Sequence, residues 1–343
     1  MAERIRIGIV GAGFGVKAHL PALAAHPRFE VVALASPSSA ATIAKERGIP
    51  HAYTSCAEMV RGCDLDAVTV ASPPFAHHDD VLAALDAGKH VLCEKPFALD
   101  VAQAQRMLEA SQRAGTVCAL SHEFRWVPAQ QALKELVENR HLQPLREIEI
   151  SQLTTLLRLD GTRERGWWFE RRRGGGIAGA WLSHVVDMSN WLAGRPPKRA
   201  MGFLRTANPE RHDARGTFTS DVDDGAFALL DYGDGLIARL CADATMAQTS
   251  STCAVHAENR TAVASGENLA ETTLYSVDAD ETAELQCKSS PYTKFASVQP
   301  NVPYLMELYD HFADAIAGKP HALPSFAEAV ETQKVLAAVG FGT

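Results

Sequence analysis

Short apolar runs and amphipathic stretches alternate along the first 125 residues of the chain. The apolar runs have the length of buried strands and occur at Ile5–Val10, Glu30–Ala35, Ala67–Ala71, His90–Cys93 and Val117–Leu120. Stretches with helical periodicity lie between them, for example at Val81–Ala87 and Val101–Ala114. Strands that alternate with helices predict βαβ units and a parallel sheet. We therefore predict an N-terminal Rossmann domain over residues 1–125.

The pattern changes after Pro128. A helix, a strand, a series of strand-like runs and two final helices are predicted, in this order, at Gln130–Asn139, Leu145–Leu156, Lys198 to about Leu285, Tyr304–Ala317 and Ser325–Ala338. Runs of strands without intervening helices favour an open, mostly antiparallel sheet. We predict a second α/β domain with such a sheet over residues 126–343, and hence a two-domain α/β fold.

Composition narrows the class of partner. The chain has 343 residues, which is more than a single hydrophobic core usually holds, so two domains are expected. Its 33 Lys+Arg against 41 Asp+Glu give a net charge of −8. This charge argues against nucleic acid or an anionic membrane as the main partner and favours a small molecule. The sequence shows neither a run of about 18 apolar residues nor a signal-peptide pattern, so we expect a cytoplasmic protein. Its seven cysteines lack CxxC spacing, which fits reduced thiols and predicts no metal site.

A glycine turn in the segment Gly8–Gly15 joins the first predicted strand to a helix. Gly11 allows a tight turn, and Gly13 lets the backbone approach a pyrophosphate at the N-terminus of the helix. The third glycine of the dinucleotide fingerprint would fall at Val16, whereas Gly15 lies one residue early. The turn predicts a dinucleotide site, and an ordinary strand-to-helix turn is the alternative.

The end of the second predicted strand bears on the choice of cofactor. An acidic residue is expected there to accept the ribose 2′-hydroxyl of NAD, but the position holds Ser36. Without a carboxylate to repel a 2′-phosphate, Ser36, Ser38, Ser39 and Lys45 are candidate donors to one. NADP is therefore slightly favoured over NAD. The alternative, equally weighted, is that these serines are only polar loop groups.

An isolated lysine, Lys95, directly follows the strand His90–Cys93. The carboxyl ends of parallel strands line the ligand crevice of a doubly wound sheet, so Lys95 is expected beside whatever the glycine turn binds. Burial lowers the pKa of a lysine, which makes it a candidate acid or base. A solvated loop lysine is the alternative.

Several segments resemble the glucose-fructose oxidoreductase/inositol dehydrogenase/rhizopine catabolism (Gfo/Idh/MocA) family over nearly the whole chain. They are the glycine turn with His19–Leu23, Ala71–Pro74 with His77, Ala87–His90 leading to Glu94-Lys95-Pro96, Arg125 with Pro128, and Gly174–Gly176 leading to Ser183–Asp187. The resemblance implies a nicotinamide-dependent oxidoreductase of sugars, inositols or related polyols, with the lysine beside the nicotinamide ring. It also implies a cis Lys95-Pro96 bond, and a second domain whose sheet carries the substrate and the contacts of a homodimer or homotetramer.

The expected site follows from these motifs. We expect the cofactor to contact a set of residues after the predicted strands, namely Gly11, Gly13, Phe14, Gly15, Ser36, Ser72, Pro73, His77, Glu94 and Lys95. We expect the substrate to contact Lys95, Arg125, Trp167, Trp168 and His184. Lys95 and His184 are the expected catalytic residues.

The chain departs from the family pattern on the helix that carries His184. The family usually places an aspartate four residues before this histidine, where the chain has Ala180. His184 then lacks the group that would fix its tautomer, unless another acid such as Asp187 reaches it. The alternative is that His184 is a packed core histidine.

The segment between Arg158 and Arg173 holds six arginines and the pair Trp167-Trp168. Arginine and aromatic side chains together suit a sugar ring or an anionic group, which makes this a candidate substrate loop. A solvated or subunit-contact loop with internal ion pairs is the alternative.

The sequence thus predicts an NAD(P)-dependent dehydrogenase or reductase that moves a hydride between the nicotinamide and a secondary alcohol or ketone of a sugar-like substrate. Two alternatives stay open. One is an enzyme that retains its cofactor and regenerates it in each turnover by transient oxidation, and the other is a non-catalytic nicotinamide-bound regulator.

Overall fold

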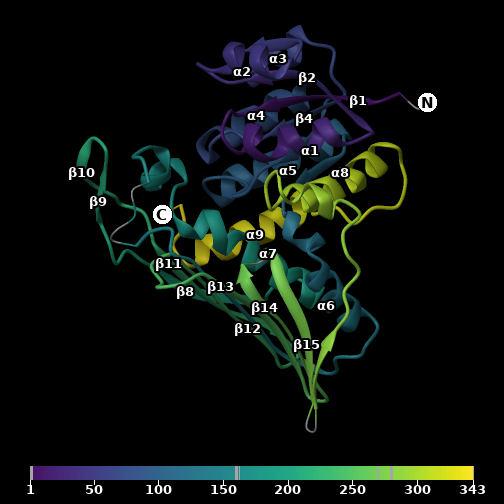
Figure 1. Ribbon diagram of the computed structural model, residues 1–343, viewed down its shortest axis with the longest axis vertical. Coiled ribbons are helices and arrows are strands. Elements are labelled where there is room, and N and C mark those ends of the chain that lie inside the picture. Colours follow the sequence, from purple (N-terminus) through teal and green to yellow (C-terminus); the bar gives the residue numbers. More distant parts are fainter. Residues whose placement is uncertain (1–2, 159–160, 162, 269, 279–280, 343) are drawn as a thin grey trace. The chain divides into compact units, whose positions relative to one another are not determined.

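The computed structural model describes residues 3–158, 161, 163–268, 270–278 and 281–342. They form two compact units (Figure 1). Unit 1 comprises Met1–Glu123 and Ser290–Val330, and unit 2 comprises Phe124–Ser289 and Glu331–Thr343. The chain therefore leaves unit 1 and returns to it near its end.

Unit 1 is built on a parallel sheet of six strands in the order β3-β2-β1-β4-β5-β6. The strands are β1 (Ile5–Val10), β2 (Phe29–Ala35), β3 (His51–Tyr53), β4 (Ala67–Val70), β5 (His90–Cys93) and β6 (Cys118–Leu120). Its helices are α1 (Leu20–Ala25), α2 (Ala40–Arg47), α3 (Cys56–Gly62), α4 (Pro74–Asp86), α5 (Val101–Ala114) and α8 (Val302–Ile316). This strand order is that of a Rossmann fold, which confirms the predicted class.

Burial explains which of these elements the sequence pattern found. The central strands β1 and β4 are apolar and almost wholly buried, and both were predicted. The edge strand β3 has three residues, none of them buried, and gave no apolar signal. Helix α2 has only two buried residues, Ala40 and Ala44, and its pattern is correspondingly weak.

Helix α8 belongs to unit 1 and packs against α1. Its Tyr309 and Phe312 rings lie 5.2 Å and 6.5 Å from the ring of Phe29 on β2. The residue Pro324 also reaches the sheet, where its carbonyl accepts the amide of Leu120 on β6. The expected domain ranges, 1–125 and 126–343, group this segment differently, because apolar pattern alone does not reveal which sheet a late helix covers.

Unit 2 contains an eight-stranded sheet in the order β16-β15-β14-β13-β7-β12-β11-β8. The strands are β7 (Leu145–Leu153), β8 (Arg199–Arg205), β11 (Gly225–Gly233), β12 (Leu236–Asp243), β13 (Ser250–Ala257), β14 (Thr261–Asn268), β15 (Glu271–Val277) and β16 (Thr282–Leu285). Only the β7–β12 pair is parallel among these neighbours. The expected open, mostly antiparallel sheet is confirmed.

Helices α6 (Pro128–Glu138) and α7 (Ser183–Ala193) pack on one face of this sheet. A separate hairpin is formed by β9 (Glu210–Asp213) and β10 (Gly216–Thr219), and α9 (Phe326–Ala338) runs from unit 1 into unit 2 (Figure 1). Residues alternate along β11, so that Ala228 and Leu230 are buried while Leu229 is exposed. No helix among the described residues is long and apolar enough to cross a membrane.

Candidate active site

The glycine turn of unit 1 has the geometry of a phosphate cradle. Gly11 has a φ of +109°, and a Cβ there would lie 2.2 Å from the carbonyl oxygen of Ala71, so only glycine fits. A Cβ on Gly13 would meet no described atom within 4 Å. The backbone at Gly13 is thus open to a ligand at the start of the following helix, which favours an anion.

Gly15 takes the place of the missing third glycine. A Cβ there would lie 3.0 Å from the Ile9 side chain and 3.3 Å from the Ala71 side chain, so glycine lets the helix pack closely on β1 and β4. The helix begins with a π-helical turn, Gly15–His19, rather than a regular α-helical turn. The early glycine therefore serves the close packing that the fingerprint assigns to its third position.

Ser36 lies at the carboxyl end of β2, beside this turn. Val10 on β1 is in register with Ala35, and the amide of Gly11 donates to the Ala35 carbonyl at 2.9 Å. The Ser36 hydroxyl lies 3.0 Å from that of Ser39, and both side chains are partly exposed. The residue that would select the ribose in this fold is therefore a neutral hydroxyl, as the sequence indicated.

Ser72, Pro73 and His77 surround the end of β4. The Ser72 hydroxyl donates to the carboxylate of Asp80 at 2.6 Å, and Pro73 precedes the first turn of α4. The two ring nitrogens of His77 lie 2.7 Å from the Ser72 carbonyl oxygen and 2.9 Å from the Pro96 carbonyl oxygen. The ring therefore connects the segments that follow two neighbouring strands, β4 and β5. Burial lowers the pKa of His77.

Glu94 and Lys95 follow β5 at the same edge of the sheet. Cys93 pairs with Val70, which in turn pairs with Val10 before the glycine turn. The Lys95-Pro96 bond is cis, as the resemblance implied. Lys95 is partly exposed, whereas Glu94 is buried. The structure thus brings the expected cofactor and catalytic residues of unit 1 to one sheet edge.

A buried chain of side chains holds Glu94, and sequence reasoning missed it. His19 places Nε2 3.0 Å from Glu94 Oε1 and Nδ1 2.8 Å from the Tyr309 hydroxyl, which lies 2.9 Å from the Thr69 hydroxyl. A carboxylate only accepts, so with a neutral imidazole His19 donates to Glu94 and accepts from Tyr309. Burial acts to raise the pKa of Glu94, but the hydrogen bond from His19 and the charge of Lys95 act against it, and the pKa is lowered.

The residues of unit 1 fit a nicotinamide dinucleotide. The bare backbone at Gly13, the helix N-terminus behind it and the hydroxyl of Ser36 are the groups that a pyrophosphate and a ribose need. Glu94 and Lys95 follow β5, which lies two strands away from β1 in the sheet. The described residues hold no cluster of three His, Cys, Asp or Glu side chains that could bind a metal ion.

In unit 2, His184 lies on α7 within a group of aromatic rings. It is 3% exposed, and its ring centroid lies 4.5 Å from that of Phe124 and 6.3 Å from that of Trp181. The Phe124 and Trp181 rings stack with an interplanar angle of 7°. His184 is therefore a polar group in an apolar wall.

Arg125 and Asp187 form a buried bidentate ion pair in unit 2. Arg125 Nε donates to Asp187 Oδ2 at 2.8 Å, and a terminal nitrogen donates to Oδ1 at 2.6 Å. The two side chains are 4% and 2% exposed. Arg125 was expected to contact substrate, and Asp187 was one candidate to support His184. In the structure the two side chains form an ion pair with each other.

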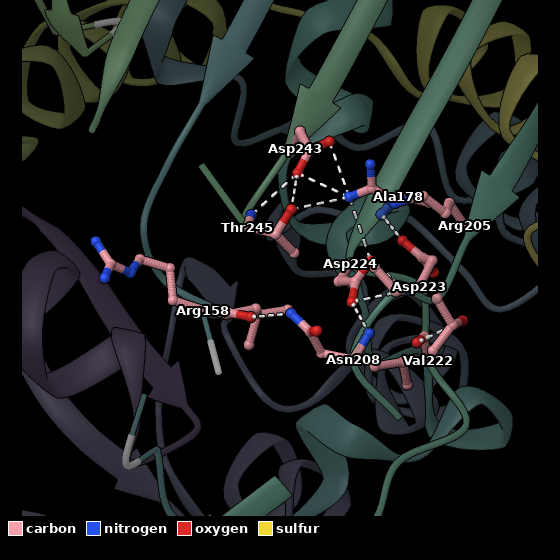
Figure 2. A network of polar contacts seen from close by, with 12 residues as sticks. Arg158, Ala178, Arg205, Asn208, Val222, Asp223, Asp224, Asp243 and Thr245 are labelled. Atoms are coloured by element: carbon pink, nitrogen blue, oxygen red, sulfur yellow. Dashed lines mark hydrogen bonds and ion pairs between the residues drawn. The ribbon is translucent and has the colours of Figure 1, made fainter. Parts of the chain in front are cut away.

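A second acid, Asp223, holds the start of the helix that carries His184. Its carboxylate accepts the amide of Ala178 at 2.6 Å, as Figure 2 shows, and its backbone carbonyl accepts the amide of Ile177. Burial raises the pKa of Asp223 to about 6. A Cβ on Gly176, whose φ is +100°, would lie 2.4 Å from Asp223 Oδ1. No sequence spacing signals this contact, because it joins residues 45 apart.

The neighbouring Asp224 and Asp243 belong to an arginine network (Figure 2). Asp224 and Asp243 each lie within ion-pair distance of Arg205, at 3.4 Å and 2.9 Å, and Asp224 also lies 3.3 Å from Arg211. Asp224 further accepts the backbone amides of Ala207 and Asn208. This network joins the ends of β8, β11 and β12.

The segment with the tryptophan pair is partly exposed and rich in ion pairs. Trp167 and Trp168 lie in a short 3₁₀ turn, and the guanidinium of Arg163 lies 4.3 Å from the Trp168 ring centroid. Arg165 forms a bidentate pair with Asp213 at 2.8 Å and 2.9 Å. Residues 159, 160 and 162 of this segment lie outside the described residues. Within the segment, Glu170 pairs with Arg172 and Arg173 at 3.4 Å and 3.3 Å. Such internal ion pairs are part of the interpretation as a solvated or subunit-contact loop.

Fold and sheet edge together define a dinucleotide-binding protein with a second α/β domain. Residues 5–122 match the model of the oxidoreductase family with an NAD-binding Rossmann fold, GFO/IDH/MocA, and residues 130–263 match the GFO/IDH/MocA C-terminal domain. The chain belongs to the Gfo/Idh/MocA family of oxidoreductases, as its motifs indicated.

Relatives of this chain include named sugar-acting enzymes. Levoglucosan dehydrogenase of Pseudarthrobacter phenanthrenivorans is 27% identical over 260 residues, which is 68% of this chain and 66% of that protein. 1,5-anhydro-D-fructose reductase of Ensifer adhaerens is 32% identical over 216 residues, or 61% of this chain and 60% of that protein. An uncharacterised oxidoreductase of Synechocystis is 33% identical over 62% of this chain and 57% of its own. The chain thus matches about three fifths of the length of these relatives.

Solved structures share the whole fold. An oxidoreductase domain protein from Kribbella flavida has a TM-score of 0.87 at 24% identity and covers 99% of this chain and 97% of its own. Levoglucosan dehydrogenase in complex with NADH and levoglucosan has a TM-score of 0.85 at 23% identity, with 98% and 96% covered. At identities of 23% and 24%, this similarity shows a shared fold.

Proposed function

We propose that this protein is an NAD(P)-dependent oxidoreductase that transfers a hydride between the nicotinamide and a secondary alcohol or ketone of a sugar-like substrate. The observation that carries the proposal is the position of Lys95 at the strand edge that also bears the glycine turn. The family membership and the sugar-acting relatives support it.

Lys95 is the proposed acid and base. A bound nicotinamide supplies the hydride acceptor, and the hydroxyl of the alcohol must lose its proton as the hydride leaves the carbon. The neutral Lys95 amine accepts that proton, and in the reverse direction the ammonium donates it to the carbonyl oxygen. Glu94, held by His19, is a fixed negative charge next to Lys95 in sequence. It stabilises the ammonium form that follows proton transfer.

His184 is proposed to position substrate rather than to carry the proton alone. Its ring is set among Phe124 and Trp181, and the family's aspartate is replaced by Ala180. Asp223 fixes the start of its helix. A histidine held in this way offers a directed hydrogen bond to a sugar hydroxyl, and the neighbouring rings offer an apolar surface.

For the cofactor we propose at least equal affinity for NADP and NAD. Ser36 carries no charge to repel a 2′-phosphate. The hydroxyl of Ser39 lies 3.0 Å from that of Ser36 and is a second candidate donor. We expect Ser36→Asp to shift the preference toward NAD by about tenfold, because a carboxylate accepts the 2′-hydroxyl and repels the phosphate. Fluorescence titration of both cofactors into both proteins measures this. A wild-type protein strongly selective for NAD would contradict the assignment.

We also propose that the protein is a homo-oligomer that pairs through the open face of its eight-stranded sheet. Met201 and Phe203 on β8 are 58% and 61% exposed, and Met201 is in register with the exposed Leu229 on β11. These side chains share the face opposite the buried Ala228 and Leu230. Phe203→Asp is expected to lower the sedimentation mass to that of a smaller species, with unchanged circular dichroism. An unaltered mass would place the contact elsewhere.

A panel of polyols, sugars and anhydrosugars tests the activity itself. The protein is mixed with each compound and with NAD or NADP, and the absorbance band of reduced nicotinamide is followed. We expect the band to grow with at least one member. A change that stops at one equivalent of cofactor per protein would instead indicate a cofactor-retaining enzyme. Bound cofactor without any change over the panel would favour the regulator, for which Ala180 is the motivating residue.

A further inference from the structure

A second carboxyl group, Glu123, lies at the same strand edge as Lys95. Cys93 on β5 is in register with Leu120 on β6, and the amide of Ser121 donates to the Cys93 carbonyl at 2.7 Å. Neighbouring parallel strands lie about 4.8 Å apart, so the residues after β5 and those after β6 leave the sheet side by side. Glu94 and Lys95 follow one strand, and Glu123 follows the other.

The surroundings of Glu123 are unusual for a carboxyl group. It is 1% exposed. One oxygen, Oε1, accepts the side-chain amide of Asn301 at 2.8 Å, and the other, Oε2, has no hydrogen-bond partner among the described residues. Among the described residues no arginine or lysine lies within ion-pair distance of it, in contrast to Asp187 and Asp224 of unit 2. A buried carboxyl with so few donors favours its neutral form.

One helix holds both carboxyl groups. Asn301 stands at the start of α8 and binds Glu123, and Tyr309, two turns further on, reaches Glu94 through His19. Eight residues of helix span about 12 Å. Helix α8 therefore holds both acids, but through different hydrogen bonds. Glu94 accepts from His19, which in turn contacts Tyr309, whereas Glu123 accepts from the side-chain amide of Asn301 alone among the described residues.

We propose that Glu123 controls the charge of Lys95: it is uncharged while Glu94 carries the single negative charge of the pair, and its ionisation holds Lys95 as an ammonium. The proposal deepens the proposed function, on which its catalytic meaning rests. It makes Glu123 a positioning residue, one that acts on the substrate through Lys95.

The charges around the pair support this division. The pKa of Glu123 is raised to about 8. Burial and then the charge of Glu94 raise it, and the charge of Lys95 and the side-chain amide of Asn301 act in the opposite direction. The titratable groups that act on Glu94 or feel its charge are His19, Lys95, Cys93, Glu123, His77 and Tyr309. Two neighbouring acids of which one is kept neutral are a known way to separate their roles.

The consequence concerns the chemical reactivity of the Lys95 amine. Below the pKa of Glu123 its carboxyl is uncharged and adds nothing to the stability of the ammonium. Above that pKa the new carboxylate attracts the ammonium and makes the amine less reactive toward an acylating reagent. Glu123→Gln is the permanent neutral form, so Lys95 in this variant should be more reactive at alkaline pH.

Competitive labelling with acetic anhydride tests the proposal in the full-length protein without substrate. The extent of labelling at Lys95 is read by mass spectrometry of its peptide against an internal amine standard. At about pH 9 we expect Lys95 to be about three- to tenfold more reactive in Glu123→Gln than in wild type. At about pH 6.5 the two proteins should react equally, because Glu123 is uncharged in both.

Two further variants complete the test. Asn301→Ala removes the donor to Oε1 and raises the pKa of Glu123 again, so Lys95 reactivity at about pH 9 should rise by a smaller factor. Glu109→Gln, on the exposed side of α5, removes a charge elsewhere and should leave the reactivity within twofold.

Equal reactivity of wild type and Glu123→Gln at both pH values would overturn the proposal, and so would an increase of the same size at both. Labelling needs no turnover, so the result separates the two levels of the argument. A pH-dependent change in labelling combined with normal activity of Lys95→Ala would refute the role of Lys95 and leave the control by Glu123 standing.

Discussion

The buried acids of unit 1 have neutral or titratable partners, whereas most of those in unit 2 have arginines. Glu94 is hydrogen-bonded to His19, and Glu123 is hydrogen-bonded to Asn301. Asp187 instead forms an ion pair with Arg125, and Asp224 and Asp243 form ion pairs with Arg205. Arginine keeps its charge at any pH relevant to proteins, while histidine, lysine and a desolvated carboxyl do not. The protonation state of unit 1 therefore responds to pH, and the ion pairs of unit 2 hold a fixed geometry.

Removal of an arginine from unit 2 gives the largest expected effect. Arg125→Ala leaves the Asp187 carboxylate buried without its bidentate partner. We expect a loss of about 3–5 kcal/mol in the free energy of unfolding, measured by urea denaturation. The double variant Arg125→Met/Asp187→Leu is the control and should recover most of the loss. A loss below about 1 kcal/mol for the single variant would show that this pair is not the fixed element we describe.

Lys95→Ala examines the other side of the comparison. We expect turnover to fall by at least about a hundredfold, since general acid–base catalysis contributes that much or more. Cofactor affinity should stay within a few-fold, because backbone groups at the glycine turn hold the phosphates. Steady-state kinetics on the substrate found in the panel, with cofactor titration alongside, gives both values. Near-normal turnover would remove Lys95 from the mechanism.

His184→Ala is expected to have a smaller effect, of about tenfold, divided between a raised KM and a lowered kcat. The reason is that Ala180 stands where the family usually has an aspartate, and in the proposed mechanism His184 positions the substrate. His184→Gln, which keeps a hydrogen-bonding side chain, should recover part of the KM change. A larger kcat loss than that of Lys95→Ala would exchange the two roles.

The sequence predicted those elements whose own burial produced a pattern. The bounds of β1, β5 and α5 coincide with the predicted ones, because these segments alternate cleanly between core and surface. Gly11, Ser36 and Lys95 were found because each follows a buried strand of a fold with a known ligand edge.

What sequence could not reveal are contacts between distant residues. His19 and Tyr309 are 290 residues apart, and Asp223 and Ala178 are 45 apart. No periodicity links such pairs, since their meeting depends on the topology of a whole unit. The partner of Arg125 could not be predicted for the same reason, and the different hydrogen-bond partners of Glu94 and Glu123 are visible only in the folded chain.

The return of the chain to unit 1 has a consequence for the order of events during synthesis. The glycine turn, Glu94 and Lys95 leave the ribosome early, but Asn301 and Tyr309 follow some 200 residues later, as does Pro324, which bonds to the edge strand β6. Until then β6 is an uncovered edge, and His19 and Glu123 lack their partners. The strand ends that carry Lys95 and Glu123 are thus complete only after Pro324 has been made, so a chain that stops before this residue holds the glycine turn without an assembled site.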